Sequence, residues 1–369
     1  MPSSRLTDPW QLGALRIPNR VLLAPLAGIG NWFVRLQAKR YGAGMAVSEM
    51  VSSHAIHYRN ERTMRELLCI HPEERAHAAD LVRRSISGDD ACGGAGLPVA
   101  PTSIQLFGSD PEVMRSAAAT VAAGGADAID LNMGCPVPKV CKTGAGAALL
   151  SDPARAVAVA RAAVQGAAEG ASAPRGGRVP VTVKLRSGQR PGDNSGFELA
   201  QRLVADAGVA AIGFHPRSAA VHHKGTPDYA LAARLAETLP APVILTGGMN
   251  DAEGIRAAFA RTGVAAVMLA RGCLGNPWLF EELVGGREAQ PAPAEVREEL
   301  EWVIDRAVEH LGEERAGRYL RKFYPWYLPR LDLDRTRLVE LQQQLQASAD
   351  VAEARRLLGL PARPAALAA

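Results

Sequence analysis

The sequence predicts a (β/α)₈ barrel followed by a small helical domain, and three observations support this prediction. Short apolar runs alternate with amphipathic, alanine-rich stretches from about residue 20 to about residue 285. Eight such runs are present, and eight strands alternating with helices over roughly 250 residues is typical of this barrel. Polar or glycine residues lie at or just past the ends of most of the runs, at Glu49, Gln105, Asn132, Lys184, His215, Gly247 and Arg271.

The eight apolar runs are short and contain much valine and isoleucine, as is typical of buried parallel strands. They are residues 21–25, 45–50, 103–108, 128–134, 181–188, 210–218, 242–249 and 265–272. Residues 111–124 and 152–166 are predicted helices, since each begins with an acidic residue or proline and ends with glycine. A doubly wound sheet has the same rhythm. It would spread the polar strand ends along a line, whereas a barrel gathers them at one mouth.

Two segments interrupt the rhythm and set the domain boundaries. Residues 76–102 end in a stretch rich in glycine, proline, aspartate and alanine, which predicts a surface loop. Residues 284–296 read as a linker, after which charged and apolar residues mix at helical spacing. We therefore expect a barrel domain over residues 1–288 and a helical domain over residues 289–369.

The composition indicates a globular protein without a membrane segment. The 369 residues are 47% hydrophobic and 22% charged, and the net charge of +4 permits a polyanionic partner without requiring one. We find no apolar run of the length that a signal peptide or a membrane span needs. Five widely spaced cysteines then favour reduced thiols, so the expected location is the cytoplasm.

Cys135 lies in a Gly-Cys-Pro turn directly after the fourth predicted strand. Such a turn would fix a thiol at the barrel mouth, and a thiol that is protonated at neutral pH can act as an acid. The alternative is a small buried cysteine with no chemical role. Cys141 follows six residues later, but no further cysteine or histidine cluster accompanies the two, so we expect neither a disulfide nor a metal site.

Two pairs of basic residues are predicted at neighbouring strand ends. Lys184 and Arg186 are two residues apart on one strand, so they point to the same side, and His215 and Arg217 repeat this arrangement. Cations aimed into a barrel mouth indicate an anionic or electron-rich ligand. A solvated strand end and a Schiff-base lysine are the alternatives for Lys184.

Glycine-rich loops follow the last two predicted strands, where barrels commonly bind phosphate through backbone N–H groups. They contain Gly247, Gly248 and Arg271, and the arginine would add a charged partner. After the first strand, Pro25 and its small neighbours would allow a flat ligand to approach the backbone, while Gln105 offers an amide to a ring carbonyl. Together these groups favour a planar heterocycle that carries a phosphate.

With these motifs the sequence resembles the tRNA-dihydrouridine synthases of the general bacterial type. The matching segments are APLAG, SEMVS, HPEER, QLFGSDPE, IDLNMGCP, KTGAGAALL, VTVKLRSG, FHPRS, TGGM and ARGCLGNPWLF, in order over residues 20–282. The resemblance implies an FMN-dependent barrel, a helical tRNA-binding domain, and NADPH, or else NADH, as the reductant. The family's catalytic cysteine aligns with Cys135, and Asn132 is expected to face the target base. The implied FMN contacts are Pro25, Leu26, Ala27, Gln105, Lys184, His215, Gly247, Gly248, Ala270 and Arg271.

The expected reaction is reduction of the C5=C6 bond of uridine in tRNA. Reduced FMN supplies the hydride, and Cys135 supplies the proton from the opposite face. Asn132, Lys184, Arg186 and His215 are candidate donors to the pyrimidine oxygens, and Arg217 is a further substrate-binding candidate. The base must leave its stack to reach a barrel mouth, so a surface that holds RNA is needed as well.

The predicted helical domain offers such a surface. Arg315, Arg318, Arg321 and Lys322 fall at helical spacing, so we expect them on one broad helix face, interleaved with aromatic residues. A solvated basic face beside an aromatic core anchor is the alternative. Two segments depart from the family pattern and could alter which RNA is accepted: the long insertion at 76–102 and the His222-His223-Lys224 run.

Two other functions fit parts of the sequence. An FMN oxidoreductase similar to dihydroorotate dehydrogenase would share the barrel and an active-site thiol, but the helical tail argues against it. A non-catalytic RNA-binding barrel would not need the set formed by Asn132, Cys135, Lys184 and His215.

Overall fold

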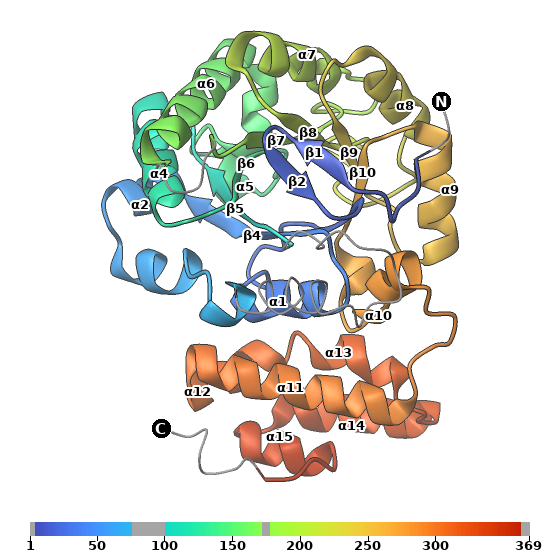
Figure 1. Cartoon of the computed structure of the whole chain (residues 1–369). Helices are drawn as coiled ribbons and strands as arrows, with labels where there is room; N and C mark the ends of the chain where they lie inside the picture. The colour runs from blue at the N-terminus through green and yellow to red at the C-terminus, as the bar shows by residue number, and fades with distance from the viewer. Residues whose placement is uncertain (1–3, 76–99, 172–177, 363–369) are drawn as a thin grey trace, which may run out of the picture. The chain divides into compact units, whose positions relative to one another are not determined.

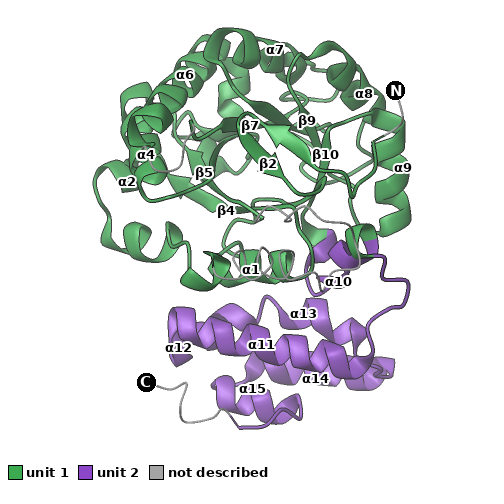
Figure 2. Cartoon of the chain, in the orientation of Figure 1, with its two compact units in different colours: residues 1–271, 283–285 green, residues 272–282, 286–369 purple. Residues whose placement is uncertain are grey.

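The computed structural model describes residues 4–75, 100–171 and 178–362, so most of the predicted loop at 76–102 lies outside the described residues. The chain forms two compact units (Figure 2). The first comprises residues 1–271 and 283–285, and the second comprises residues 272–282 and 286–369. The second unit therefore includes 272–282, a segment that the boundary expected at residue 288 assigns to the barrel domain.

The first unit contains a closed, fully parallel barrel of eight strands, in the order β10-β3-β4-β5-β6-β7-β8-β9 (Figure 1). Each barrel strand coincides with one of the eight predicted runs, so the predicted barrel is confirmed. The strands are β3 (Val21–Leu23), β4 (Met45–Ser52), β5 (Thr102–Phe107), β6 (Ala128–Met133), β7 (Val181–Arg186), β8 (Ala211–His215), β9 (Val243–Thr246) and β10 (Ala266–Leu269).

A short antiparallel hairpin precedes the barrel and was not predicted. It consists of β1 (Trp10–Leu12) and β2 (Leu15–Ile17), joined by a two-residue turn at Gly13 and Ala14. Trp10, Leu12 and Ile17 are buried in one cluster with inward-facing barrel residues such as Met45 and Met268. The hairpin thereby fills the barrel core with apolar side chains and leaves the polar chemistry to the opposite strand ends.

Helices surround the barrel on the outside (Figure 1). The longer ones are α1 (Trp32–Arg40), α4 (Pro111–Ala123), α6 (Pro153–Gly170), α7 (Ser195–Ala207), α8 (Tyr229–Thr238) and α9 (Ala252–Thr262). Asp110, Asp152, Asp228 and Asp251 cap four of them by accepting hydrogen bonds from N–H groups of the first turn. Such caps satisfy backbone donors that the helix itself cannot, which fixes where each loop ends.

Short elements occupy the loops of the first unit and the start of the second. They are α2 (Ser53–His57), a π-helix at Thr63–Leu67, α5 (Pro138–Cys141), a 3₁₀ turn at Gly146–Ser151, another at Arg271–Cys273, α10 (Trp278–Phe280) and a π-helix at Glu281–Gly285.

The second unit is a helical bundle. Its elements are α11 (Pro293–Leu311), α12 (Glu313–Leu320), α13 (Tyr324–Tyr327), a 3₁₀ turn at Leu328–Arg330, α14 (Arg335–Ala347) and α15 (Val351–Leu357). Tyr324 and Tyr327 are buried, and the buried guanidinium of Arg355 on α15 pairs with Glu301 and Asp305 of α11. None of the helices in the described part of the chain is long and apolar enough to cross a membrane.

Candidate active site

The Cys135 turn follows β6 and is held by bonds on both of its sides. The Asn132 side-chain oxygen accepts hydrogen bonds from the backbone N–H groups of Cys135, at 2.9 Å, and Gly134, at 3.2 Å. The Cys135 carbonyl accepts a bond from the N–H of Ala147 at 2.9 Å and one from the Cys141 thiol at 3.3 Å. Cys141 is thus used to brace the turn, while the half-buried Cys135 thiol is a free sulfhydryl at the end of a barrel strand.

A layer of polar side chains lies next to this turn. The Gln105 amide donates to Asp130 Oδ2 at 2.6 Å and accepts from Asn132 Nδ2 at 2.9 Å, and Thr182 Oγ1 donates to Asp130 Oδ1 at 2.5 Å. Burial raises the pKa of Asp130, although the bonds from Thr182 and Gln105 oppose this. The Gln105 amide, predicted to contact a cofactor, therefore has one donor and one acceptor position already engaged within the protein.

Lys184, on β7, is a cation that interacts electrostatically with both Asp130 and Cys135. Burial and the neighbouring Arg186 lower its pKa to about 8, while Asp130 and the Cys135 sulfur act in the opposite direction. Its ammonium group has no hydrogen-bond or ion-pair partner among the residues that the structure describes. A lysine that is buried without a partner destabilises the folded protein. The ammonium group of Lys184 is therefore suited to bind a ligand in the mouth of the barrel.

Arg186 has a different environment from Lys184. The whole residue is 3% exposed, and its guanidinium donates to three carbonyls, those of Gly134 at 2.9 Å, Ser218 at 3.0 Å and His222 at 2.6 Å. These acceptors belong to the loops after β6 and β8, so Arg186 ties them together. Its predicted contact with substrate stays a prediction.

His215, the last residue of β8, and Arg217, just after this strand, lie side by side. Burial and the cations Lys184, Arg186 and Arg217 keep the pKa of His215 far below its ordinary value, so the imidazole is neutral. Arg217 Nη1 is 3.3 Å from His215 Nε2, and Arg217 Nη2 donates to the Gly225 carbonyl at 2.6 Å. The buried Arg217 Nε has no partner among the described residues.

The loop after β9 has two neighbouring positions at which there is no room for a side chain. Gly247 and Gly248 have φ angles of +98° and +79°, and a Cβ at Gly247 would lie 2.5 Å from the His215 ring. No described residue accepts a hydrogen bond from the N–H of either glycine. Two N–H groups without a described acceptor, one of them on a glycine that neighbours Arg217, have the donor chemistry that a phosphate-bearing planar ligand requires. Arg271, at the end of β10, has no hydrogen-bond partner among the described residues either.

The loop after β3 carries the predicted contacts Pro25, Leu26 and Ala27 and is braced from behind by ionic groups. Gly28 N–H donates to Glu49 Oε2 at 2.9 Å. The buried Arg35 donates to the Gly30 carbonyl at 3.2 Å and pairs with Glu74 at 2.7 Å.

Three features of the site were not predicted from the sequence: the Arg35–Glu74 pair, the Asp130–Thr182 bond and the bracing role of Arg186. The acidic pair within HPEER and an aspartate inside the apolar run 128–134 are the signals that could have indicated the first two.

In the second unit the four predicted basic residues do not share one helix. Arg315 and Arg318 lie on α12, which ends at Leu320, so Arg321 and Lys322 lie in the turn that follows. Arg318 pairs with Glu314 at 3.2 Å, Lys322 lies over the Tyr319 ring, and Arg321 donates to the Ser348 carbonyl at 3.0 Å. The expectation of a single helix face is therefore wrong for Arg321 and Lys322, because the chain turns after Leu320 to bury Phe323 and Tyr324.

Comparison with known proteins identifies relatives over most of the chain. A family model described as Dihydrouridine synthase (Dus) matches residues 22–361. The "tRNA-dihydrouridine synthase B" of Shewanella oneidensis is 32% identical over 327 residues, which is 87% of this chain and 90% of that protein. The protein of the same name from Pseudomonas aeruginosa is 33% identical, with 87% of each chain covered. A "Probable tRNA-dihydrouridine synthase" of Mycobacterium tuberculosis is also 33% identical, over 86% of this chain and 77% of that one.

Solved structures share the fold at low sequence identity. A complex of 2-naphthoyl-CoA reductase with 2-naphthoyl-CoA superposes with a TM-score of 0.52 at 14% identity, and 77% of this chain covers about half, 52%, of that one. A morphinone reductase variant in complex with tetrahydroNAD gives a TM-score of 0.50 at 16% identity, over 79% of this chain and 94% of that one. At such identities these matches support the barrel architecture and nothing finer.

Proposed function

Because the chain belongs to the dihydrouridine synthase family, we propose that it reduces the C5=C6 bond of specific uridines in tRNA to 5,6-dihydrouridine, with FMN as its cofactor and NADPH or NADH as reductant. The observation that carries the proposal is the position of the Cys135 thiol, on a turn held by Asn132 and close to Lys184, which has no partner among the described residues. The family match disfavours an enzyme similar to dihydroorotate dehydrogenase. A fixed thiol beside an unpaired cation is likewise more than a non-catalytic barrel needs.

The residues at the mouth fit FMN by their donor chemistry. The N–H groups of Gly247 and Gly248, together with Arg271, would hold the phosphate, and the loop Pro25–Ala27 would lie against the ring system. Lys184 would place its ammonium at a ring oxygen or nitrogen, which would compensate for its desolvation. Once reduced by NADPH or NADH, the bound FMN would supply a hydride to the substrate.

The chain's own groups then have three tasks. The Cys135 thiol donates a proton to C5 of the pyrimidine, which requires it to lie on the face opposite to the hydride donor. Asn132 holds the turn that aims this thiol, because its oxygen receives the Cys135 N–H. The neutral His215 can donate one hydrogen bond without adding a further positive charge to the crowded cations.

Recognition of tRNA would depend on phosphate contacts outside the mouth. The exposed Arg318 and Lys322 of the second unit are candidates, together with the half-buried Arg315. Such contacts hold the RNA by charge and do not read its sequence.

A direct experiment tests this proposal. Unmodified tRNA transcript is incubated with the purified protein, FMN and NADPH without oxygen, and the digested RNA is examined by mass spectrometry. We expect a gain of about 2 Da on particular uridines, from the two added hydrogens, and consumption of NADPH that depends on flavin. Flavin-loaded protein that oxidises NADPH but leaves all uridines unchanged would contradict the proposed substrate. Protein that cannot be reconstituted with FMN would contradict the cofactor.

A further inference from the structure

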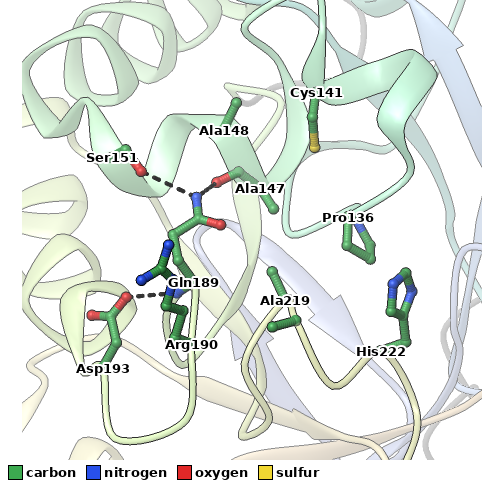
Figure 3. Close-up of a pocket in the computed structure, with 11 residues that line it drawn as sticks. Pro136, Cys141, Ala147, Ala148, Ser151, Gln189, Arg190, Asp193, Ala219 and His222 are labelled. Atoms are coloured by element: carbon green, nitrogen blue, oxygen red, sulfur yellow. Dashed lines mark hydrogen bonds between the residues drawn. The ribbon is translucent and has the colours of Figure 1, made fainter.

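An open pocket of about 820 Å³ lies beside the Cys135 turn and has no part in the chemistry described so far (Figure 3). Its walls come from the loops that follow β6, β7 and β8. Pro136, the residue directly after Cys135, and Cys141 form one wall, so the pocket shares a boundary with the turn that carries the thiol.

The pocket combines a small apolar surface with polar groups. Ala147, Ala219 and Ala220 contribute only methyl groups, which leaves room for a flat ligand. The exposed Arg190 has no acceptor for its guanidinium among the described residues. Gln189 is held in place by donating to the Ala147 carbonyl and to Ser151 Oγ, as Figure 3 shows.

Asp193 gives the pocket an acceptor of fixed position. Its carboxylate receives the N–H groups of Gln189 at 2.6 Å and Ser195 at 2.8 Å. Although burial opposes it, these bonds hold the pKa of Asp193 below its ordinary value, so the group is an anion at neutral pH. The N–H groups of a nucleobase would be attracted to this carboxylate, whereas a phosphate would be attracted to the exposed Arg190 instead.

His222 lines the pocket with a strained backbone. Its φ of +54° is uncommon for a residue with a side chain, and its carbonyl accepts the 2.6 Å bond from Arg186. Strain of this kind persists only where surrounding bonds enforce it, and it is concentrated at ligand sites. Because Arg186 also binds the Gly134 carbonyl, it couples this wall of the pocket to the Cys135 turn.

We propose that this pocket binds the nucleotide next to the target uridine in the RNA, with its base against the alanine surface and Arg190 near a phosphate. This inference rests on the proposed function, since it names a further part of the same substrate. When the uridine is turned into the barrel mouth, its neighbour in the chain must be displaced as well. Because Pro136 belongs both to the pocket lining and to the turn that carries Cys135, the pocket would be within reach of that neighbour.

The test is to fill the pocket without touching the chemistry. Ala220 is exposed, so Ala220→Trp places an indole in the pocket, and Ala230→Trp on the exposed side of α8 is the matched control. We expect Ala220→Trp to lower kcat/KM for tRNA about tenfold or more, a loss of about 1.4 kcal/mol or more, because the indole occupies the space that the base needs. Flavin content and the rate of flavin reduction by NADPH are expected to match those of the control.

A second variant and a modified RNA separate the possible outcomes. Arg190→Ala, at an exposed position, is expected to raise KM for tRNA with little change in kcat. A tRNA that lacks the base beside the target should be a poorer substrate for the native protein, and Ala220→Trp should then cause little additional loss. The outcomes of these experiments can be told apart. Equal kcat/KM for the two tryptophan variants would overturn the inference while leaving the proposed function intact. A slower reduction of flavin by NADPH in Ala220→Trp would assign the pocket to the reductant and would also overturn the inference. Absence of dihydrouridine with the native protein would contradict the proposed function itself.

Discussion

Asn132 and Cys135 are linked by a 2.9 Å hydrogen bond from the cysteine N–H to the asparagine side-chain oxygen. The same oxygen receives the Gly134 N–H, and the Asn132 amide donates to Gln105. Asn132 therefore connects the polar side chains at the neighbouring strand to the turn that carries the thiol, and it holds this turn in place. Its expected role facing the target base would be additional to this positioning role.

Asn132→Ala should slow the reaction with tRNA by about 10²-fold, the effect expected when a reacting group is misplaced by about 1 Å. Asn132→Asp keeps the oxygen acceptors and is expected to retain more activity than the alanine variant, although it loses the donor to Gln105. The rate at which tRNA reoxidises the reduced flavin measures both. If the two variants lose activity equally while flavin reduction is normal, the turn does not depend on this acceptor.

Lys184 is predicted to lower the free energy of unfolding of the apoprotein and to strengthen flavin binding. Each tenfold change in proton affinity corresponds to about 1.4 kcal/mol, so a pKa lowered from 10.5 to about 8 represents at most roughly 3 kcal/mol. Lys184→Met should therefore stabilise the apoprotein at pH 7 and weaken FMN binding by about 10- to 100-fold, the loss of one charge-assisted bond. Melting curves and flavin titration test this, with the exposed Lys142→Met as the control.

The pH dependence of this effect has a definite sign. In the folded apoprotein Lys184 loses its proton near pH 8, whereas in the unfolded chain a lysine keeps it up to about pH 10.4. Between these values the unfolded chain binds more protons, so the folded state gains stability as the pH rises. The advantage of Lys184→Met in Tm should thus be largest below pH 8 and decrease toward pH 10. An advantage that does not change with pH would show that the pKa of Lys184 is the same in the folded apoprotein as in the unfolded chain.

The basic residues of the second unit are predicted to act on RNA affinity alone. A variant with Arg318→Gln and Lys322→Gln should bind tRNA more weakly, and the slope of its salt dependence should fall by about one for each phosphate that is no longer neutralised. Arg321 is left unchanged because it braces Ser348. Arg202→Gln with Arg234→Gln, at exposed positions on α7 and α8, is the matched control. Equal affinity and salt dependence for the two double variants would show that Arg318 and Lys322 are merely solvated.

The barrel could be predicted from the sequence because the alternation of strands and helices, and the length of each element, are set by residues close together in the chain. Each barrel strand is a short apolar run, and the helices carry aspartate caps next to their first turns. The hairpin at Trp10–Ile17 was missed because its strands have only three residues each, although the Gly13 turn between alternating residues is a recognisable signal.

The residues of the candidate site could be predicted from the sequence, whereas the hydrogen bonds between them could not. That Lys184 and Arg186 point to the same side of their strand follows from strand alternation. That one has no described partner while the other binds three carbonyls depends on loops far apart in the sequence. The same holds for Gln105 and Asp130, whose hydrogen bond requires the register between β5 and β6.

The central claim is that Cys135 donates the proton in a flavin-dependent reduction of uridine. Its most direct test is single-turnover reoxidation of reduced flavin by tRNA in Cys135→Ala and Cys141→Ala. Both variants should bind FMN and be reduced by NADPH as the native protein is. Cys135→Ala should react with tRNA about 10²- to 10⁴-fold more slowly, since a general acid is lost. Cys141→Ala should remain near the native rate, because it loses only a weak bond to the Cys135 carbonyl. A fast Cys135→Ala variant, or a slow Cys141→Ala variant beside it, would contradict the claim.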